Sequence, residues 1–201
     1  MKDQWNVRYS TSEYVYGTEP NDVLREHEPK LLRGSKILCL ADGEGRNGVF
    51  LAERGHSVTS VDASVIGLEK AQQLALERGV EIKTVVADLA EFDLGTGQWD
   101  AIVSIFCHVP PPLRAKIHSQ VSRALLKGGV FLLEAYTPDQ LQHHTGGPPF
   151  AELMMSETLL RSELTGMEFE FCEEREREIH EGALHNGISS VVQCFARRID
   201  P

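Results

Sequence analysis

The sequence predicts an α/β fold in which a mostly parallel sheet ends in an antiparallel hairpin. From residue 37 onward, apolar strand-like segments alternate with helix-like segments, and this order is typical of a parallel sheet with crossover helices. Two longer strand-like runs follow, 167–179 and 188–197, with only a short glycine-containing connection between them. Because a parallel crossover needs about a dozen residues or more, these two runs are expected to pair antiparallel.

The parallel part of the sheet is predicted from short apolar runs, which suit strands that are covered on both faces. These runs are 36–40, 57–61, 82–86, 100–106 and 130–136. Ser64 can cap a helix that Gly79 ends, and a second helix is expected from about Pro112 to Leu126, ended by Gly128-Gly129. Shorter helices are expected over Asn21–Glu28, over Val49–Arg54 and from Ser156.

Length and composition indicate one domain. The chain has 201 residues, 41% of them hydrophobic and 25% charged, and domains of about 100 to 200 residues are the usual size. It offers no run of the roughly 18 apolar residues that a membrane span requires, and its polar start does not resemble a secretory signal. We therefore expect a cytoplasmic protein without a membrane partner, and the oligomeric state stays open.

The charge and the cysteines exclude two further classes. A net charge of −10 repels the phosphate backbone that nucleic-acid binders must neutralise, so no nucleic-acid partner is expected. The cysteines are widely spaced and form no Cys-x-x-Cys pair, which favours buried free thiols: Cys39, Cys107, Cys172 and Cys194. His143-His144, His180 and His185 form no recognisable ligand spacing, so no metal is expected.

The most informative motif is a glycine-rich turn directly after the first predicted strand. Residues 43–48 read Gly-Glu-Gly-Arg-Asn-Gly, which matches the G-x-G-x-x-G pattern of nucleotide-binding turns. Asp62 lies 19 residues beyond Gly43, close to the usual offset of the acid that binds a ribose. The alternative for Asp62 is an exposed acid at a strand end. The pattern predicts a nucleotide-like cofactor near residue 43.

Asp88 follows the third predicted strand and can meet an adenine. Its side chain would accept from the adenine amino group while the Leu89 N–H faces the ring. The alternative is a loop acid that caps a turn.

Together with further motifs, this arrangement resembles the class I S-adenosylmethionine-dependent methyltransferases, and most closely the tellurite-resistance-type group related to the thiopurine methyltransferases. The segments that carry the resemblance are Trp5 and Tyr9, residues 43–47, Val61-Asp62, Ala87-Asp88, residues 99–104, residues 126–129 and the last hairpin. The resemblance implies a Rossmann-like fold with a seven-stranded sheet of order 3-2-1-4-5-7-6, strand 7 antiparallel, and helices on both faces. It also implies S-adenosylmethionine as cofactor, S-adenosylhomocysteine as product and a small-molecule acceptor.

The resemblance divides the single domain 1–201 into three parts. These are an N-terminal lid and helix (1–33), a cofactor-binding core (34–136), and a substrate-side loop, helix and hairpin (137–201). Gly43 and Gly45 would flank the methionine part, Asp62 would hold the ribose and Asp88 the adenine. The full set of implied cofactor-binding residues is Asp42, Gly43, Glu44, Gly45, Asn47, Asp62, Ala63, Asp88, Leu89, Ile105 and Phe106.

One departure from the family pattern stands in the turn itself. The family usually reads Asp-Leu-Gly-Cys-Gly, whereas this chain has Cys39-Leu40-Ala41-Asp42-Gly43. The usual acid is therefore Cys39 and the first glycine is Ala41. Asp42 supplies an unexpected carboxylate, which could replace the missing charge near the cofactor's ammonium group.

The acceptor chemistry is less constrained than the cofactor site. Methyl transfer mainly requires alignment of donor and nucleophile, so a soft acceptor such as a thiol or a metalloid oxyanion needs no strong base. A hydroxyl or amine acceptor would need one, and the candidates are His108, Tyr136, His180 and His185. For each histidine the alternative is an ordinary surface or hydrogen-bonded role. Trp5, Tyr14 and Tyr16 either close over the cofactor or only pack on the sheet, and Arg177 could reach an anionic acceptor.

Two other functions fit the same motifs. The glycine pattern and Asp62 suit a nicotinamide-dependent oxidoreductase, although the antiparallel hairpin stands where a second mononucleotide-binding half would lie. A protein that binds S-adenosylmethionine without catalysis is the other alternative, because Cys39 and Ala41 depart from the family pattern.

Overall fold

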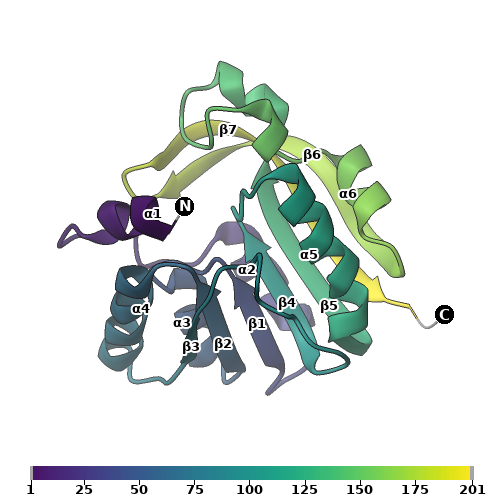
Figure 1. Ribbon diagram of the computed structural model, residues 1–201, viewed down its shortest axis with the longest axis horizontal. Coiled ribbons are helices and arrows are strands. Elements are labelled where there is room, and N and C mark those ends of the chain that lie inside the picture. Colours follow the sequence, from purple (N-terminus) through teal and green to yellow (C-terminus); the bar gives the residue numbers. More distant parts are fainter. Residues whose placement is uncertain (1, 200–201) are drawn as a thin grey trace.

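The computed structural model describes residues 2–199, and its centre is one seven-stranded sheet (Figure 1). The strand order is β3-β2-β1-β4-β5-β7-β6, as the sequence predicted. The first five strands run parallel, whereas β7 runs antiparallel to both β5 and β6. The strands are β1 (Lys36–Leu40), β2 (Ser57–Asp62), β3 (Lys83–Val86), β4 (Trp99–Ile105), β5 (Leu125–Tyr136), β6 (Met167–Glu181) and β7 (His185–Arg198).

Helices cover both faces of the sheet, and the alternation of side chains along β1 explains how. Leu38 and Leu40 pack on the face that also buries Ile117 of α5 (Pro111–Ala124) and Leu160 of α6 (Glu157–Glu163). Ile37 and Cys39 point to the opposite face, because successive side chains of a strand alternate. That face is covered by α2 (Asp22–His27) and α3 (Arg46–Glu53).

The remaining helical segments lie around this core. The α4 helix (Val65–Glu77) begins at Ser64, whose hydroxyl accepts from the Gly67 N–H, so the predicted cap is confirmed. The α1 helix (Lys2–Tyr9) packs against α4 (Figure 1). Single turns of 3-10 helix occupy Glu28–Lys30, Pro138–Gln142 and Ala151–Leu153. None of the helices within residues 2–199 has the length and apolar character needed to cross a membrane.

The glycine pair at residues 128–129 does not end a helix, which corrects the prediction. The α5 helix ends at Ala124, and β5 already starts at Leu125, which pairs with Trp99 before the register shifts. A side chain at Gly129 would lie 2.8 Å from the Leu126 carbonyl oxygen. The pair therefore lies at an irregularity inside β5, where the register with β4 shifts and a side chain at Gly129 would not fit.

Candidate functional site

A cavity of about 470 Å³ opens at the carboxyl ends of the central parallel strands. Its floor comes from the ends of β1, β2 and β4 and the residues after β3. Residues of α1 line one side, and the segment 146–149 lines another. This is the edge at which open α/β sheets bind their ligands. The lining includes nine of the implied cofactor residues, namely Asp42, Glu44, Asn47, Asp62, Ala63, Asp88, Leu89, Ile105 and Phe106.

The glycine turn and Asp62 are joined by hydrogen bonds. The Gly43 N–H donates to Asp62 Oδ2 over 2.9 Å, and the Ser64 N–H donates to Oδ1 over 2.8 Å. Burial raises the pKa of Asp62, while these backbone donors lower it. Gly43 has a φ of +56°, and a Cβ there would lie 2.5 Å from the Tyr9 hydroxyl. Glycine is therefore needed both for the turn and for the close approach of Tyr9.

Two non-glycine residues at this edge have left-handed backbone conformations. Ala41, after β1, has a φ of 50°, and Phe106, after β4, has a φ of 51°. Both line the cavity. Such conformations cost roughly 1–2 kcal/mol for a residue with a Cβ and cluster at ligand sites.

Asp42 is buried between β2 and the first turn of α3. Its Oδ2 accepts from the Ser60 hydroxyl over 2.6 Å, and a Cβ on Gly48 would lie 2.4 Å from the same oxygen. Burial, opposed by the Ser60 hydrogen bond and assisted by the nearby Asp62, raises the pKa of Asp42 to about 7. The carboxyl group is thus only partly ionised near neutral pH. Its compensation for the missing family acid stays a prediction.

Glu44 holds the N-terminal segment onto the turn. Its Oε2 accepts from the Val15 N–H over 2.8 Å and from the Tyr16 N–H over 3.4 Å, and its Oε1 pairs with Lys70. Both oxygens are engaged by the protein. Glu44 therefore fixes the position of Tyr16, and with it the aromatic side chains that cover the cavity.

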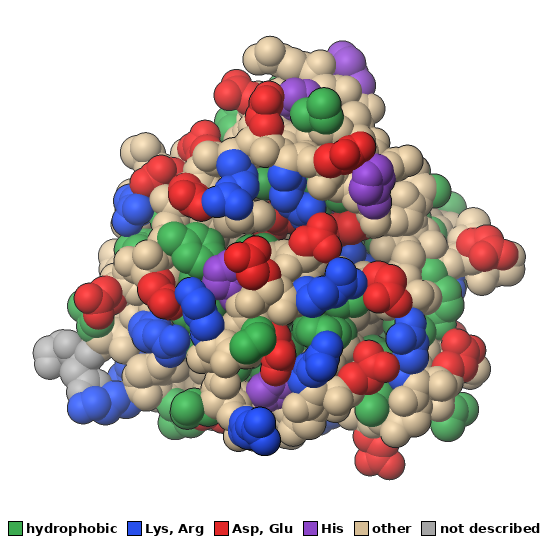
Figure 2. Space-filling view, turned by 180° about the vertical axis from the view of Figure 1, so that it is seen from behind, with side chains coloured by type: hydrophobic (Ala, Val, Ile, Leu, Met, Phe, Trp, Pro, Cys, Tyr) green, Lys and Arg blue, Asp and Glu red, His purple; other side chains and the backbone are tan. Residues whose placement is uncertain are grey.

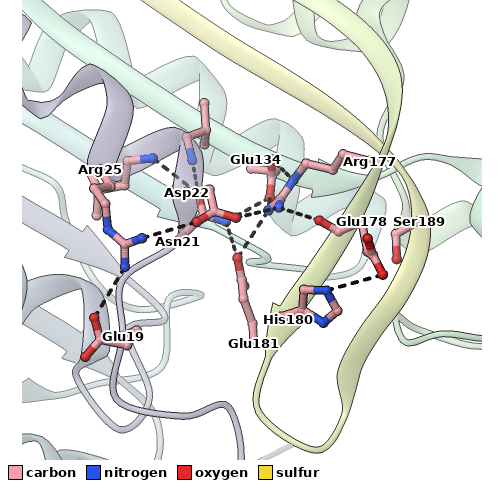
Figure 3. Close-up of polar contacts among 12 residues, drawn as sticks. Glu19, Asn21, Asp22, Arg25, Glu134, Arg177, Glu178, His180, Glu181 and Ser189 are labelled. Carbon is pink, nitrogen blue, oxygen red and sulfur yellow. Dashed lines mark hydrogen bonds and ion pairs between the residues drawn. The ribbon is translucent and has the colours of Figure 1, made fainter.

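A buried polar network joins the N-terminal segment, β5 and the hairpin (Figure 3), and Arg46 extends it to α3. Asn21 lies at its centre, because its side-chain amide donates to Glu134 and to Glu181, each over 2.8 Å. Its backbone N–H donates to Asn47 Oδ1 over 3.0 Å, which connects the network to the glycine turn. Arg46 donates to Glu181 over 2.6 Å. We refer to Asn21, Arg46, Glu134, Arg177, Glu181 and Gln193 as the Asn21 network.

Arg177 belongs to this network. Its guanidinium donates to both oxygens of Glu134 and to Glu181, and it also pairs with Asp22 over 3.0 Å. Figure 3 shows it directed at these carboxylates. Arg177 does not line the cavity. The protein's own carboxylates therefore occupy the guanidinium that the sequence suggested for an anionic acceptor.

The four candidate proton-transfer residues have different surroundings. His108 lines the cavity, but its Nδ1 donates to the Leu153 carbonyl over 2.9 Å and its Nε2 accepts from the Tyr136 N–H over 3.3 Å. Burial lowers the pKa of His108 to about 4. His180 is exposed, contacts Asn186 and Glu178, and does not line the cavity.

His185 and Tyr136 have polar atoms without partners. His185 lines the cavity, its imidazole forms no hydrogen bond with a described residue, and its buried Nδ1 is unpaired. Burial, followed by the charge of Arg46, lowers the pKa of His185 to about 3. The Tyr136 hydroxyl is also buried and unpaired, and burial raises its pKa. Tyr136 lies perpendicular to His185 with a ring separation of 5.3 Å, and Phe106 stacks on it at 4.6 Å.

The structure adds residues that the sequence did not reveal. Arg8 lines the cavity, lies over the Trp5 ring at 4.8 Å and donates to the Tyr16 hydroxyl over 2.9 Å, yet forms no ion pair with a described residue. The segment 146–149 and Leu153 also line the cavity. A one-turn spacing from Trp5 to Arg8 and Tyr9 was the available signal, because these positions share a helix face.

The residues of the cavity fit S-adenosylmethionine. The glycine turn leaves space that a side chain would close, and Asp62 and Asp88 stand at the ends of neighbouring strands, where a ribose and an adenine can be bound. Asp88 also caps its own turn through the Ala90 N–H over 2.9 Å, as the alternative prediction stated. Within residues 2–199, no group of three or more His, Cys, Asp or Glu could hold a metal.

Comparisons with known proteins agree with this architecture. Residues 37–129 match the family model described as "Methyltransferase domain". A 2-heptyl-1-hydroxyquinolin-4(1H)-one methyltransferase of Mycobacteroides abscessus is 30% identical over 61% of this chain and 57% of its own length. A methyltransferase of Bacillus subtilis, YbaJ, is 27% identical over 65% of this chain and 48% of its own length. The chain thus spans about half the length of these relatives.

Solved structures share the fold over nearly the whole chain. A protein from a study of the conversion of a disulfide bond into a thioacetal group during echinomycin biosynthesis has a TM-score of 0.78 at 18% identity, with 98% of this chain and 92% of that chain covered. The N-methyltransferase NodS of Bradyrhizobium japonicum, solved with S-adenosylhomocysteine, has a TM-score of 0.72 at 14% identity and 99% and 98% coverage. TehB of Haemophilus influenzae has a TM-score of 0.70 at 21% identity and 98% and 67% coverage.

The fold is the Rossmann-like methyltransferase fold, with the strand order 3-2-1-4-5-7-6 and β7 antiparallel. Within this chain, residues 37–129 form the part that matches the methyltransferase domain model. The comparisons agree with the predicted enzyme class and cofactor, and they do not favour a nicotinamide-dependent oxidoreductase.

Proposed function

We propose that this chain is a methyltransferase that uses S-adenosylmethionine to methylate the soft nucleophile of a small molecule, a thiol or a metalloid oxyanion. The observation that carries the proposal is the Asp62 carboxylate, held against the Gly43 turn at the floor of the cavity. A carboxylate in that position can accept from both ribose hydroxyls. When bound, the cofactor supplies a methyl group on a positively charged sulfur, and the electron pair of the broken bond stays with that sulfur.

The charges of the cavity support a cationic cofactor. Four acidic residues line it, Asp42, Glu44, Asp62 and Asp88, against the two arginines Arg8 and Arg46. Arg46 is already paired with Glu181, and Glu44 with Lys70, which leaves three aspartates against Arg8. A cleft lined mainly by one sign of charge concentrates ligands of the opposite sign.

The position of Arg8 suits the carboxylate of the methionine part of S-adenosylmethionine. Its guanidinium has no carboxylate partner among the described residues, although Tyr16 and Trp5 fix its position. Arginine suits the bidentate recognition of a carboxylate. In this proposal Arg8 binds the cofactor's carboxylate, and the Trp5 and Tyr9 rings, stacked at 5.6 Å, exclude water from the site.

The weakness of the available bases supports a soft acceptor. His108 uses both ring nitrogens within the protein, and His185 stays neutral with a pKa of about 3. A general base works best when its pKa lies near the working pH. These weak bases therefore suit an acceptor that binds already deprotonated, as a thiolate or a metalloid oxyanion. The work of the site is then the alignment of the reactants.

The subgroup and the acceptor class are part of the proposal. Trp5, Tyr9 and the last hairpin resemble the tellurite-resistance-type group, and TehB is among the structural neighbours. A small molecule fits better than a nucleic acid, given the net charge of −10. Figure 2 shows acidic and basic side chains interspersed over one face, without a continuous basic stripe.

Calorimetric titration of the purified protein with S-adenosylmethionine and S-adenosylhomocysteine tests the cofactor. We expect both to bind, and NADH not to bind; the absence of binding at millimolar ligand would contradict the proposal. Transfer of a radiolabelled methyl group is then measured across thiols, metalloid oxyanions and small phenols. Cofactor binding without any turnover would indicate a purely binding protein.

A further inference from the structure

His185 is the first residue of β7, and aromatic rings hold its imidazole in place beside the cavity. The centre of its ring lies 4.5 Å from that of Tyr16, 4.7 Å from that of Phe106 and 5.3 Å from that of Tyr136. A Cβ at Gly146 would lie 3.2 Å from His185 Cδ2. Packing alone therefore fixes the imidazole, which forms no hydrogen bond with a described residue.

The two ring nitrogens of His185 differ in their access to the cavity. Nδ1 is buried without a partner, whereas Nε2 is not fully buried and belongs to a side chain that lines the cavity. Burial, followed by the charge of Arg46, lowers the pKa of His185 to about 3, so the ring is neutral at pH 7 and carries one proton. Buried N–H groups without a partner are rarer than unpaired acceptors. The proton therefore belongs on Nε2, which makes His185 a hydrogen-bond donor toward the cavity.

The charged groups around His185 favour a negative ligand beside it. After burial, the charge of Arg46 has the largest effect on the pKa of His185 and lowers it, Glu181 raises it, and Arg8 lowers it further. Because these charges together disfavour a positive imidazolium ring, they favour an anion at the same place. His185 thus combines a fixed N–H donor with surroundings that suit negative charge.

The other titratable groups that face His185 are uncharged at pH 7. Burial lowers the pKa of His108 to about 4 and raises the pKa values of the Tyr16 and Tyr136 hydroxyls. A group with a pKa so far from the working pH is a poor general base. An acceptor that reacts beside His185 therefore has to lose its proton before it binds.

We propose that His185 binds the methyl acceptor by donating its Nε2–H to the reacting atom, and that this atom is already negatively charged when it binds. The inference rests on the proposed function and deepens it, because it names the residue that holds the reacting atom. The acceptor atom forms the new bond to the methyl carbon with its own electron pair, and the electron pair of the broken bond stays with the cofactor's sulfur. No proton is transferred, and His185 keeps its Nε2 proton throughout.

Binding of 4-nitrobenzenethiol to the protein saturated with S-adenosylhomocysteine tests this without turnover. This thiol is ionised at neutral pH, and its thiolate absorbs visible light, so one titration reports both its affinity and its charge. The uncharged comparison ligands are benzyl mercaptan, which stays largely protonated, and 4-nitrothioanisole, in which a methyl group replaces the thiol proton. We expect the thiolate to bind at least about tenfold more tightly than either, because a hydrogen bond to a charged group is among the stronger ones. The pKa of the bound thiol should lie below that of the free thiol.

Two variants at residue 185 distinguish a hydrogen-bond donor from a base. His185→Gln keeps an N–H near the position of Nε2 but cannot act as a base, so it should bind the thiolate nearly as tightly as the wild type. His185→Phe keeps the aromatic packing and removes the donor, so it should weaken thiolate binding about tenfold or more. Affinity for S-adenosylhomocysteine should not change in either variant. His180→Phe is the matched control, because His180 is exposed on the same hairpin and does not line the cavity.

The outcomes separate the inference from the proposed function. If S-adenosylhomocysteine does not bind, both are wrong. If it binds but the thiolate does not, or if the thiolate binds no more tightly than the uncharged ligands, only the inference is wrong. Unchanged thiolate affinity in His185→Phe also overturns it, as does a His185→Gln variant that binds as weakly as His185→Phe. If His185→Phe fails to fold, the wild type decides: a pKa of the bound thiol that is not below that of the free thiol contradicts the inference.

Discussion

At the scale of single residues, the site combines backbone strain with unusual ionisation directly after β1. Ala41 takes a left-handed conformation where the family usually has glycine, and Asp42 is buried beside it with a raised pKa. Both features cost stability, and both lie on the floor of the cavity. Conformations that lower the stability of the fold are common at ligand-binding sites.

Replacing Ala41 by glycine should relieve this strain. We expect the free energy of unfolding of Ala41→Gly to rise by at most about 1 kcal/mol. The left-handed conformation penalises Cβ by roughly 1–2 kcal/mol, and the greater freedom of glycine in the unfolded chain offsets part of this gain. Denaturant titration measures the change. Ala52→Gly, in the helix α3, is the control and should be less stable than the wild type.

Asp42 gives a prediction that depends on pH. Its folded-state pKa of about 7 lies above the ordinary pKa of 3.8 for an aspartate, so its contribution to stability falls as pH rises from about 4 through about 7. Asp42→Asn should therefore equal the wild type near pH 4 and exceed it at pH 8, by a few kcal/mol at most. If Asp42 also replaces the missing family acid, the same variant binds S-adenosylmethionine more weakly at pH 8. An unchanged affinity would rule that compensation out.

Arg8 is tested with ligands that differ at the carboxylate. Arg8→Gln should weaken the binding of S-adenosylhomocysteine about tenfold or more, since a charge-assisted pair contributes roughly 1.5–3 kcal/mol. Binding of 5′-methylthioadenosine, which has no amino-acid part, should not change. Calorimetry of the two ligands with Arg25→Gln, an exposed arginine outside the cavity, is the control. If Arg8→Gln weakens the binding of both ligands equally, Arg8 does not bind the carboxylate of the cofactor.

At the scale of elements, the sequence predicted the first four strands more accurately than the start of β5. The apolar runs that predicted β1, β2, β3 and β4 agree with the observed strands to within a residue at each end, because buried parallel strands leave a continuous signal. The start of β5 was missed, because the sequence predicted that Leu125 and Leu126 end a helix, whereas Leu125 pairs with Trp99 of β4. Such pairings between distant residues leave no local pattern.

The site could be predicted in part for the same reason. The glycine turn, Asp62 and Asp88 carry a fixed spacing, and the structure brings them to one cavity. The contacts of His108 and Arg177 could not be predicted from the sequence, because their partners Leu153 and Glu134 are distant along the chain. The helix α1 was expected only as a polar lid with aromatic residues, since its eight residues show little amphipathic pattern.

At the scale of the whole molecule, the Asn21 network joins parts of the chain that are far apart in the sequence. Asn21 follows the N-terminal segment, Glu134 lies on β5, and Glu181 ends β6. Arg46 and Asn47 extend the network to the first turn of α3, beside the cavity. Cofactor binding and the position of the hairpin should therefore depend on one another.

Loss of Asn21 tests this connection. Asn21 caps α2 and donates to two buried carboxylates. Asn21→Ala should therefore lower the free energy of unfolding by roughly 2–4 kcal/mol, the sum of a lost cap and of two charged acceptors that each lose one of their donors. Affinity for S-adenosylhomocysteine should fall as well. Once the Asn21 side chain no longer fixes residue 21, the backbone N–H that donates to Asn47 Oδ1 shifts, and Asn47 is held less firmly. Asn186→Ala, at an exposed position of the hairpin, should change neither quantity appreciably. A loss of stability with full cofactor affinity would show that the network only supports the fold, and would separate the hairpin from the cofactor site.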